Sequence, residues 1–157
     1  IKESSIDRLR EEMKPLWPAA YNTSDADFTG KVIADLQPRV KTLVELAHAA
    51  DFYFADDIQY EEEAAQKFLT RDISGHLKTM AGALPSVQNF SKEGIEEFLK
   101  NFISEHNIKF KIIAQPLRVA LTGKTVSPGI DEVMATLGKE RVIKKIGRAI
   151  DYIQSRG

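Results

Sequence analysis

Apolar residues recur at helical spacing in one segment of this chain after another, with polar residues between them. In the clearest segment, residues 95–103, apolar positions fall at i, i+3, i+4, i+7 and i+8, the stripe of an amphipathic helix. Ser91 stands where it can cap this helix. No run of useful length alternates with a period of two, so the pattern predicts an all-α fold. Four side chains of this helix are expected to be buried together: Phe98, Leu99, Phe102 and Ile103.

Turn and cap residues divide the remaining apolar pattern into further helices. The polar pairs at residues 4–5 and 24–25 are candidate N-caps. Pro38 interrupts a periodic segment, which predicts a kink or a fresh helix start with Pro38 in the first turn. The aromatic run at residues 52–54 has no partner strand, so we expect a loop anchored in the core. Gly138 follows a short apolar segment and is expected to end it in a left-handed cap.

The composition is that of a globular protein, with 43% hydrophobic and 29% charged residues in a chain of 157. No apolar run approaches the ~20 residues that cross a bilayer, and residues 1–5 lack the apolar core of a signal peptide. Cysteine is absent, which excludes disulfides and thiolate metal sites. Because the chain begins with Ile, we expect a piece of a longer protein. The acidic stretch 56–63 marks the expected boundary between two small helical domains, 1–60 and 61–157.

Positive charge is concentrated in the last third of the chain. Lys and Arg number 7 against 11 Asp and Glu in residues 1–60, and 5 against 8 in residues 61–105. Residues 106–157 hold 10 against 4, a formal charge of +6 in a chain whose total is -1. A basic run can be a solvated face, but its concentration in one third is the expected footprint of a polyanion contact.

Several chemical motifs are incomplete in this sequence. Gly123-Lys124-Thr125 is similar to the end of a phosphate-binding loop, but that loop needs a glycine where Arg118 stands. The three histidines are widely spaced, with no carboxylate at metal-ligand spacing, so we expect no metal site. No serine or carboxylate pair stands out as a catalytic set, so we expect no catalytic residue. The helices flanking Gly138 also fit a helix-turn-helix, although two helices joined by a glycine are common in any α-bundle.

The most distinctive segment is residues 114–130, which read AQPLRVALTGKTVSPGI. Pro116 precedes Arg118 by two positions, and a Ser-Pro-Gly turn follows at residues 127–129, so a single guanidinium is presented between rigid elements. Guanidinium suits planar hydrogen-bonding targets such as nucleobase edges and phosphates. A single-stranded loop exposes such base edges.

This segment, continued through residues 137–141 and 148–150, resembles the C-terminal signature of bacterial-type glutamyl-tRNA synthetases. Residues 36–43 and the aromatic run 52–54 resemble the first helical domain of the same anticodon-binding region. The resemblance covers nearly the whole chain. It implies two helical domains that form an anticodon-binding bundle.

The resemblance implies an anticodon role for five residues. Arg39, in the family's Arg-Pro-Arg turn, would contact the third anticodon base, although the first arginine of that turn is a glutamine here. Arg118 would stack on or hydrogen-bond the first anticodon base. Ser127, Pro128 and Ile130 would surround that same base, with Ser127 keeping the hydroxyl of a threonine found in some relatives.

Structural alternatives stand beside these roles. Arg39 could pair with Asp35 one turn back, and Arg118 could pair with an acidic neighbour. Lys144 and Lys145 are candidates for phosphate contacts. Such contacts would be independent of base sequence and sensitive to salt.

The implied function is recognition of tRNA(Glu), while a catalytic domain outside this chain attaches glutamate using ATP and Mg²⁺. The family's His-Ile-Gly-His-like and Lys-Met-Ser-Lys-Ser-like motifs are missing, so this segment alone should not activate glutamate and should need no cofactor. We expect a cytoplasmic monomer that binds neither DNA nor membranes. The alternative is a helical DNA-binding or protein-interaction module. Whether the parent enzyme also charges tRNA(Gln) stays open.

Overall fold

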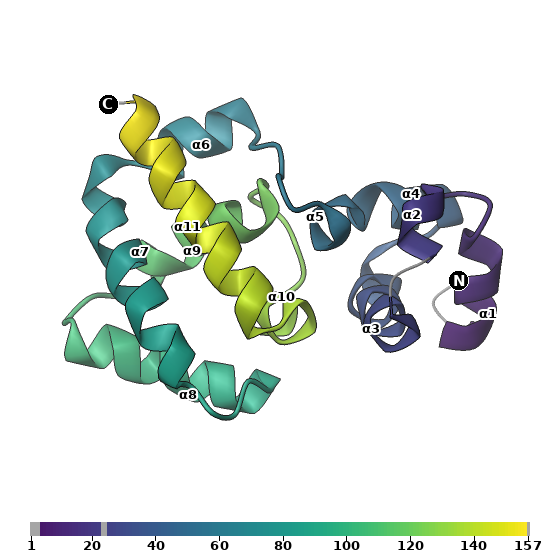
Figure 1. Cartoon of the computed structure of the whole chain (residues 1–157), viewed down its shortest axis with the longest axis horizontal. Helices are drawn as coiled ribbons and strands as arrows, with labels where there is room; N and C mark the ends of the chain where they lie inside the picture. Colours follow the sequence, from purple (N-terminus) through teal and green to yellow (C-terminus); the bar gives the residue numbers. More distant parts are fainter. Residues whose placement is uncertain (1–3, 23–24, 157) are drawn as a thin grey trace. The chain divides into compact units, whose positions relative to one another are not determined.

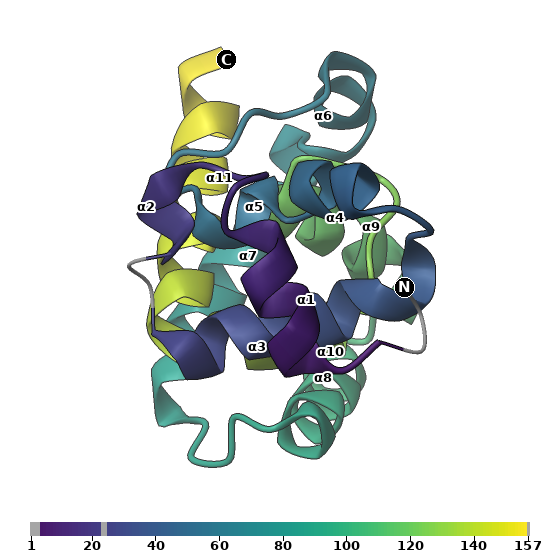
Figure 2. The ribbon, with the colours of Figure 1, turned by 90° about the vertical axis from the view of Figure 1, so that its right-hand side faces the viewer.

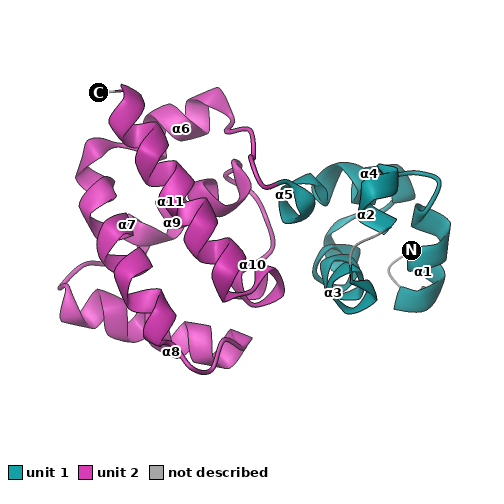
Figure 3. Cartoon of the chain, in the orientation of Figure 1, with its two compact units in different colours: residues 1–55 teal, residues 56–157 magenta. Residues whose placement is uncertain are grey.

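The computed structural model describes residues 4–22 and 25–156, and these residues form eleven α-helices and two short 3-10 helices, with no β-strand among them (Figure 1). The prediction of an all-α fold is confirmed. The chain divides into two compact units, residues 1–55 and 56–157 (Figure 3). The division falls at the start of the acidic stretch 56–63, five positions before the boundary expected from the sequence.

Unit 1 is built on the contact between its first and third helices. Helix α1 lies across α3, as Figure 2 shows, and α4 packs against both. The apolar stripes of these helices bury Leu9, Val32 and Leu46 completely. Ser5 caps α1 by accepting a hydrogen bond from the Arg8 amide at 3.2 Å, which confirms the expected cap. The elements of unit 1 are α1 (Ile6–Met13), α2 (Ala19–Asn22), α3 (Ala26–Leu36), η1 (Gln37–Arg39), α4 (Leu43–Ala49) and α5 (Asp51–Phe54).

Two local predictions for unit 1 have different outcomes. Pro38 lies in the first turn of η1, so the fresh start is confirmed. The loop expected at residues 52–54 is wrong, because these residues form the helical turn α5. The expected anchoring in the core is correct, since Phe52 and Tyr53 are buried. Burial of the two aromatic rings favours the helical backbone of this turn, and an aromatic run in the sequence does not by itself indicate that conformation. At the second candidate cap, Asp25 caps α3, and residue 24 lies outside the described residues.

Unit 2 is a bundle organised around its last helix. Helix α11 packs against α7 and α9, while α10 packs against α8 (Figure 1). The core includes Leu77, Met80, Leu117 and Ile146, all fully buried. The elements of unit 2 are α6 (Glu62–Phe68), α7 (Arg71–Ala83), η2 (Leu84–Ser86), α8 (Lys92–Glu105), α9 (Phe110–Thr122), α10 (Ile130–Leu137) and α11 (Lys139–Arg156).

Helix α8 begins where the sequence predicts, but its buried face is narrower. Ser91 caps it by accepting from the Gly94 amide at 3.2 Å. Leu99 and Phe102 are buried, whereas Phe98 and Ile103 are only partly buried, so the expectation that all four share the core is wrong. The stripe is wider than the surface that α10 covers. The side chains at its edges therefore stay half-exposed.

Two glycines set the ends of α9 and α10. Gly123 ends α9 in the left-handed conformation, with φ 77°. A Cβ at Gly123 would lie 2.1 Å from the Gln59 carbonyl oxygen, so this close approach also requires glycine. Gly138 has φ 86° and ψ 158°, so its φ is positive but its ψ is far from that of a left-handed helix, and the expected left-handed cap is wrong. Gly138 is the only residue between α10 and α11.

Candidate nucleic-acid interface

Arg118 lies near the C-terminal end of α9, at the border between the buried and exposed faces of the helix. Its neighbours Leu117 and Val119 are fully buried, while Arg118 itself is half-buried. The Nε of Arg118 donates to the Ser127 hydroxyl at 3.0 Å, and its Nη1 donates to the Gln115 side-chain carbonyl. The guanidinium is therefore held from two sides, by the helix before it and by the loop after it.

The loop at residues 123–129 is shaped to provide that second support. Thr122 donates its hydroxyl to the Arg118 carbonyl at 2.8 Å and accepts from the Lys124 amide at 3.0 Å. Ser127 donates its own hydroxyl to the Pro128 carbonyl at 2.7 Å. Because that proton is used, the Ser127 oxygen is oriented as an acceptor for Arg118. Ser127 is thus a positioning residue for Arg118 in this structure.

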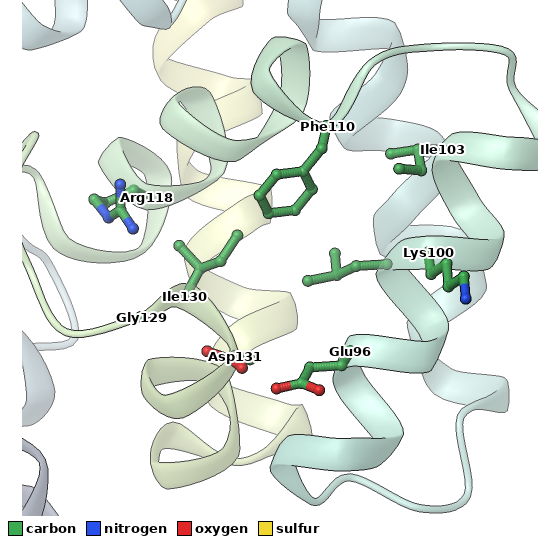
Figure 4. A pocket seen from close by; sticks show the side chains of 9 residues that line it. Glu96, Lys100, Ile103, Phe110, Arg118, Gly129, Ile130 and Asp131 are labelled. Carbon is green, nitrogen blue, oxygen red and sulfur yellow. The ribbon is translucent and has the colours of Figure 1, made fainter.

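A pocket of about 350 Å³ opens between α8, α9 and α10 (Figure 4). This volume is near the lower end of the ~300–1,000 Å³ range of ligand pockets, so it suits a group about the size of one nucleobase. Its walls are mainly apolar, and Phe110 stays 46% exposed. Pro128 is buried beside the pocket and does not line it. The lining residues are Glu96, Leu99, Lys100, Ile103, Phe110, Arg118, Gly129, Ile130 and Asp131.

Two carboxyl groups stand together at one edge of this pocket. Figure 4 shows Glu96 of α8 and Asp131 of α10 directed toward one another. A hydrogen bond to Asp131 raises the pKa of the Glu96 carboxyl, and desolvation and the negative charge of Asp131 raise it further. Arg118 itself contacts Ser127 and Gln115, and its pairing with an acidic neighbour stays an alternative.

The sequence did not single out Glu96, Lys100, Phe110 or Asp131. One signal was available for the first two. Glu96, Lys100 and Ile103 follow one another at i, i+4 and i+7, so they share a mixed face beside the buried stripe of α8. Nothing local connects that face to residues on α9 and α10, because the connection is made only by packing.

Arg39 is the last residue of η1 in unit 1, and its side chain is exposed. Asp35, which could pair with Arg39 from one turn back, accepts a hydrogen bond from the Tyr53 hydroxyl at 2.9 Å. Its role at the third anticodon base stays a prediction.

The two lysines expected to contact phosphate are placed differently. Lys144 is exposed on α11 and lies 3.7 Å from the Glu140 carboxylate. Lys145 is 4% exposed, so little of this residue faces solvent, and its phosphate contact stays a prediction. The reason for its burial is the periodicity of α11, which turns Lys145 toward the face that buries Val142, Ile146 and Ala149.

Three observations on the part of the chain that the structure describes concern other kinds of site. Residues 4–22 and 25–156 contain no group of three His, Cys, Asp or Glu side chains arranged to hold a metal ion. Over the same residues, no helix is both long and apolar enough to span a membrane. Helices α10 and α11 are separated by Gly138 alone, whereas a helix-turn-helix uses a turn of ~3–4 residues.

Comparison with known proteins gives consistent results. A family model described as an anticodon binding domain matches residues 8–150. Glutamate–tRNA ligase 1 of Syntrophus aciditrophicus is 49% identical over 99% of this chain, and glutamate–tRNA ligase of Geobacter sulfurreducens is 40% identical over 98%. In both cases the match covers 33% of the relative, so the chain spans about a third of their length.

Solved structures give the same fold. The crystal structure of a glutamate tRNA ligase from Elizabethkingia meningosepticum in complex with its amino acid superposes with a TM-score of 0.83 at 22% identity, over 96% of this chain and 30% of that one. A glutamate–tRNA synthetase from Elizabethkingia anophelis superposes with a TM-score of 0.78 at 22% identity, over 95% of this chain and 29% of that one.

Proposed function

Because this chain belongs to the anticodon-binding domain family, we propose that it binds the anticodon loop of tRNA(Glu) as the anticodon-recognition part of a glutamate–tRNA ligase. One observation carries the proposal for this chain's own residues. Arg118 is held by Ser127 and Gln115 at a base-sized pocket whose walls are mainly apolar. Unstacked loop bases are bound by this combination of flat apolar contact and a few directed hydrogen bonds.

Each residue then has a stated role. Arg118 hydrogen-bonds the edge of the first anticodon base, and Ile130 and Phe110 contact its faces. Ser127 orients Arg118 instead of contacting the base. Pro128 shapes the loop that brings Ser127 to this position.

Arg39 reads the third anticodon base from unit 1, and Lys144 contacts a backbone phosphate. An Arg39→Gln change is expected to relax discrimination at the third position by ~1–3 kcal/mol, because one base contact is lost. Affinities for loops that differ only in the third anticodon base measure this. An unchanged ratio of affinities contradicts the assignment.

The same proposal extends to the whole protein. The remaining two thirds of the relatives' length would supply the catalytic domain that joins glutamate to tRNA using ATP and Mg²⁺. This chain would supply tRNA recognition only. We place the protein in the cytoplasm, where tRNA is charged, as a monomer.

The alternative of a helical DNA-binding or protein-interaction module is not favoured. The family match covers residues 8–150 and explains the Arg118 segment, which neither alternative requires. The single-residue link between α10 and α11 also differs from the turn of a helix-turn-helix.

The experiment that tests the proposal is binding of a fluorescent anticodon stem–loop RNA to this chain, followed by anisotropy. We expect tighter binding to the glutamate anticodon loop than to the same hairpin with an unrelated anticodon. Arg118→Ala should remove most of this difference. Arg156→Ala is the matched control, because it removes the same charge from an exposed position away from the pocket. Equal affinity for both hairpins refutes the proposal.

A further inference from the structure

The chain passes from unit 1 to unit 2 through residues 56–61, the linker between α5 and α6. The last part of the linker lies directly on the end of α9. The Glu61 amide donates to the Gly123 carbonyl at 2.8 Å, and the Gln59 carbonyl oxygen lies too close to Gly123 for a Cβ to fit there. Main chain contacts main chain here, so the linker and the start of the loop at residues 123–129 are held together.

The first part of the linker is fixed to α11. Nη1 of Arg148 donates to the Asp56 carbonyl oxygen. The ring of Tyr60 packs against the ring of Tyr152, with 4.8 Å between the ring centroids. Ile58, which lies between these contacts in the sequence, is buried. The linker is thus held along its length by unit 2, which a segment that only joined two units would not need.

Gly123 begins the loop that supports Arg118. The Gln115 side-chain amide connects the two, since its nitrogen donates to the Thr125 carbonyl at 3.3 Å and its oxygen accepts from Nη1 of Arg118. Ser127 of the same loop accepts from Nε of Arg118 at 3.0 Å. Both side chains that hold the guanidinium therefore contact this loop or belong to it. Their positions depend on where the loop begins, which the contact with the linker fixes.

We propose that the linker is a positioning element for Arg118, which fixes Gly123 and, through the loop at residues 123–129, directs the guanidinium toward the bound base. Glu61 is the positioning residue, through its main-chain amide, and Arg148 holds the other end of the linker. The inference rests on the proposed function and adds the segment that keeps its site in the binding geometry. The connection between the two units then has a second task besides joining them.

A purely stabilising role of the linker would have a different consequence. Breaking the contact would then lower the free energy of unfolding, and the surroundings of the Arg118 guanidinium would be unchanged in the folded chain. A positioning role requires that these surroundings change while the chain is still folded. Urea denaturation and the side-chain spectrum of Arg118 separate the two roles.

Glu61→Pro breaks the contact at a defined place. The φ of Glu61 is -60°, which proline adopts without strain. Proline has no amide hydrogen, and its Cδ takes the place of that hydrogen, so the Gly123 carbonyl has to move away. Glu61→Ala is the matched control, because it removes the same exposed carboxylate and keeps the amide.

The first measurement uses the free chain and needs no RNA. Nitrogen–proton correlation spectra report the Arg118 Nε–H, which donates to Ser127. We expect its resonance to move in Glu61→Pro and to keep its position in Glu61→Ala. An unmoved Arg118 resonance in folded Glu61→Pro overturns this inference and leaves anticodon binding standing.

The second measurement is a set of double-mutant cycles on RNA binding. Glu61→Pro should weaken binding of the glutamate anticodon stem–loop by roughly two- to ten-fold, the effect of one net hydrogen bond. In the Arg118→Ala background it should have almost no further effect, whereas in the Arg39→Ala background the full factor should remain, because Arg39 belongs to unit 1. The same factor in both backgrounds overturns the inference. Absence of RNA binding by the wild-type chain overturns the proposed function, and the spectra of the free chain then still show whether the linker positions Arg118.

Arg148→Ala tests the other end of the linker and decides the matter if Glu61→Pro does not fold. The exposed Arg148 side chain contacts the Asp56 carbonyl and, at 3.4 Å, the Asp57 carboxylate, and both contacts are lost. Lys78→Ala is its control, because it removes one positive charge from an exposed position on α7. The Arg118 resonance should move in Arg148→Ala and keep its position in Lys78→Ala. If neither linker variant moves it, the inference is overturned.

Discussion

Removing the Ser127 hydroxyl tests how Arg118 is held, without touching Arg118 itself. In Ser127→Ala, the Nε of Arg118 loses its acceptor at 3.0 Å, while the contact of its Nη1 with Gln115 is kept. Hydrogen bonds to charged groups contribute ~1.5–3 kcal/mol, and Arg118 is half-buried, so solvent replaces part of the loss. We therefore expect RNA binding to weaken by ~1–2 kcal/mol, a factor of roughly 5–30.

A double-mutant cycle shows whether the hydroxyl acts through Arg118. Affinities for the glutamate anticodon stem–loop are measured for the wild type, Ser127→Ala, Arg118→Ala and the double variant. If Ser127 only positions Arg118, its removal should have no further effect once Arg118 is alanine, which gives a coupling energy of about 1–2 kcal/mol. Ser127→Thr is the matched control, because it keeps the hydroxyl and should bind nearly as well as wild type.

Two results would contradict this reasoning. If Ser127→Ala weakened binding by the same factor in the wild-type and Arg118→Ala backgrounds, Ser127 would be contacting RNA by itself. A Ser127→Ala chain with unchanged affinity would show that the Ser127 hydroxyl is not needed to position the guanidinium.

Three further predictions concern stability and titration. Gly123→Ala should lower the free energy of unfolding by at least ~2 kcal/mol, because φ is 77° and the new Cβ has no room. Gly82→Ala in α7 should instead raise the free energy of unfolding by up to ~1 kcal/mol. Urea denaturation measures both changes, and an unchanged free energy of unfolding in Gly123→Ala would contradict the left-handed turn. Leu99→Ala should cost ~2–5 kcal/mol, and Phe98→Ala should cost less than the ~3–5 kcal/mol of a fully buried phenylalanine. The opposite order in urea titrations would show that Phe98 belongs to the core. Burial, with the nearby charge of Asp57, raises the pKa of Tyr60 to about 12, above its ordinary value near ~10. The unionised phenol therefore stabilises the fold below pH ~10, and this contribution is lost as pH rises toward 12. Tyr60→Phe should remove one component, near pH 12, from the alkaline absorbance titration of the tyrosines. Loss of a component near pH 10 would argue against burial of Tyr60.

The parts of the fold that depend on local signals could be predicted from the sequence. Ser5 and Ser91 cap the helices expected of them, and Pro38 starts a new helical turn. These features involve residues within four positions of one another, so the local sequence contains what determines them. The left-handed end of α9 shows the limit of this. A Thr-Gly turn is visible locally, but the approach of Gln59 to Gly123 is a tertiary contact.

The wrong predictions share a cause. Helical periodicity assigns Phe98 to the core, and residue type assigns Lys145 to the surface, whereas the burial of each is set by which neighbouring helix covers it. In the candidate site, too, residues close in sequence could be predicted, and residues brought together by packing could not. Arg118 and Ser127 are nine positions apart in one segment, and their resemblance to a known family singled them out. Glu96 reaches the pocket from a different helix, and only the packing of α8 against α10 brings it beside Asp131.

The central claim is that the Arg118 pocket receives a base of the anticodon loop. Nitrogen–proton correlation spectra of the arginine side chains, recorded during titration with the glutamate anticodon stem–loop, test it most directly. The Arg118 Nε–H resonance, assigned with Arg118→Lys, should move strongly and saturate with the RNA, while that of Arg156 should hardly move. A saturated complex in which the Arg118 resonance is unchanged would contradict the account.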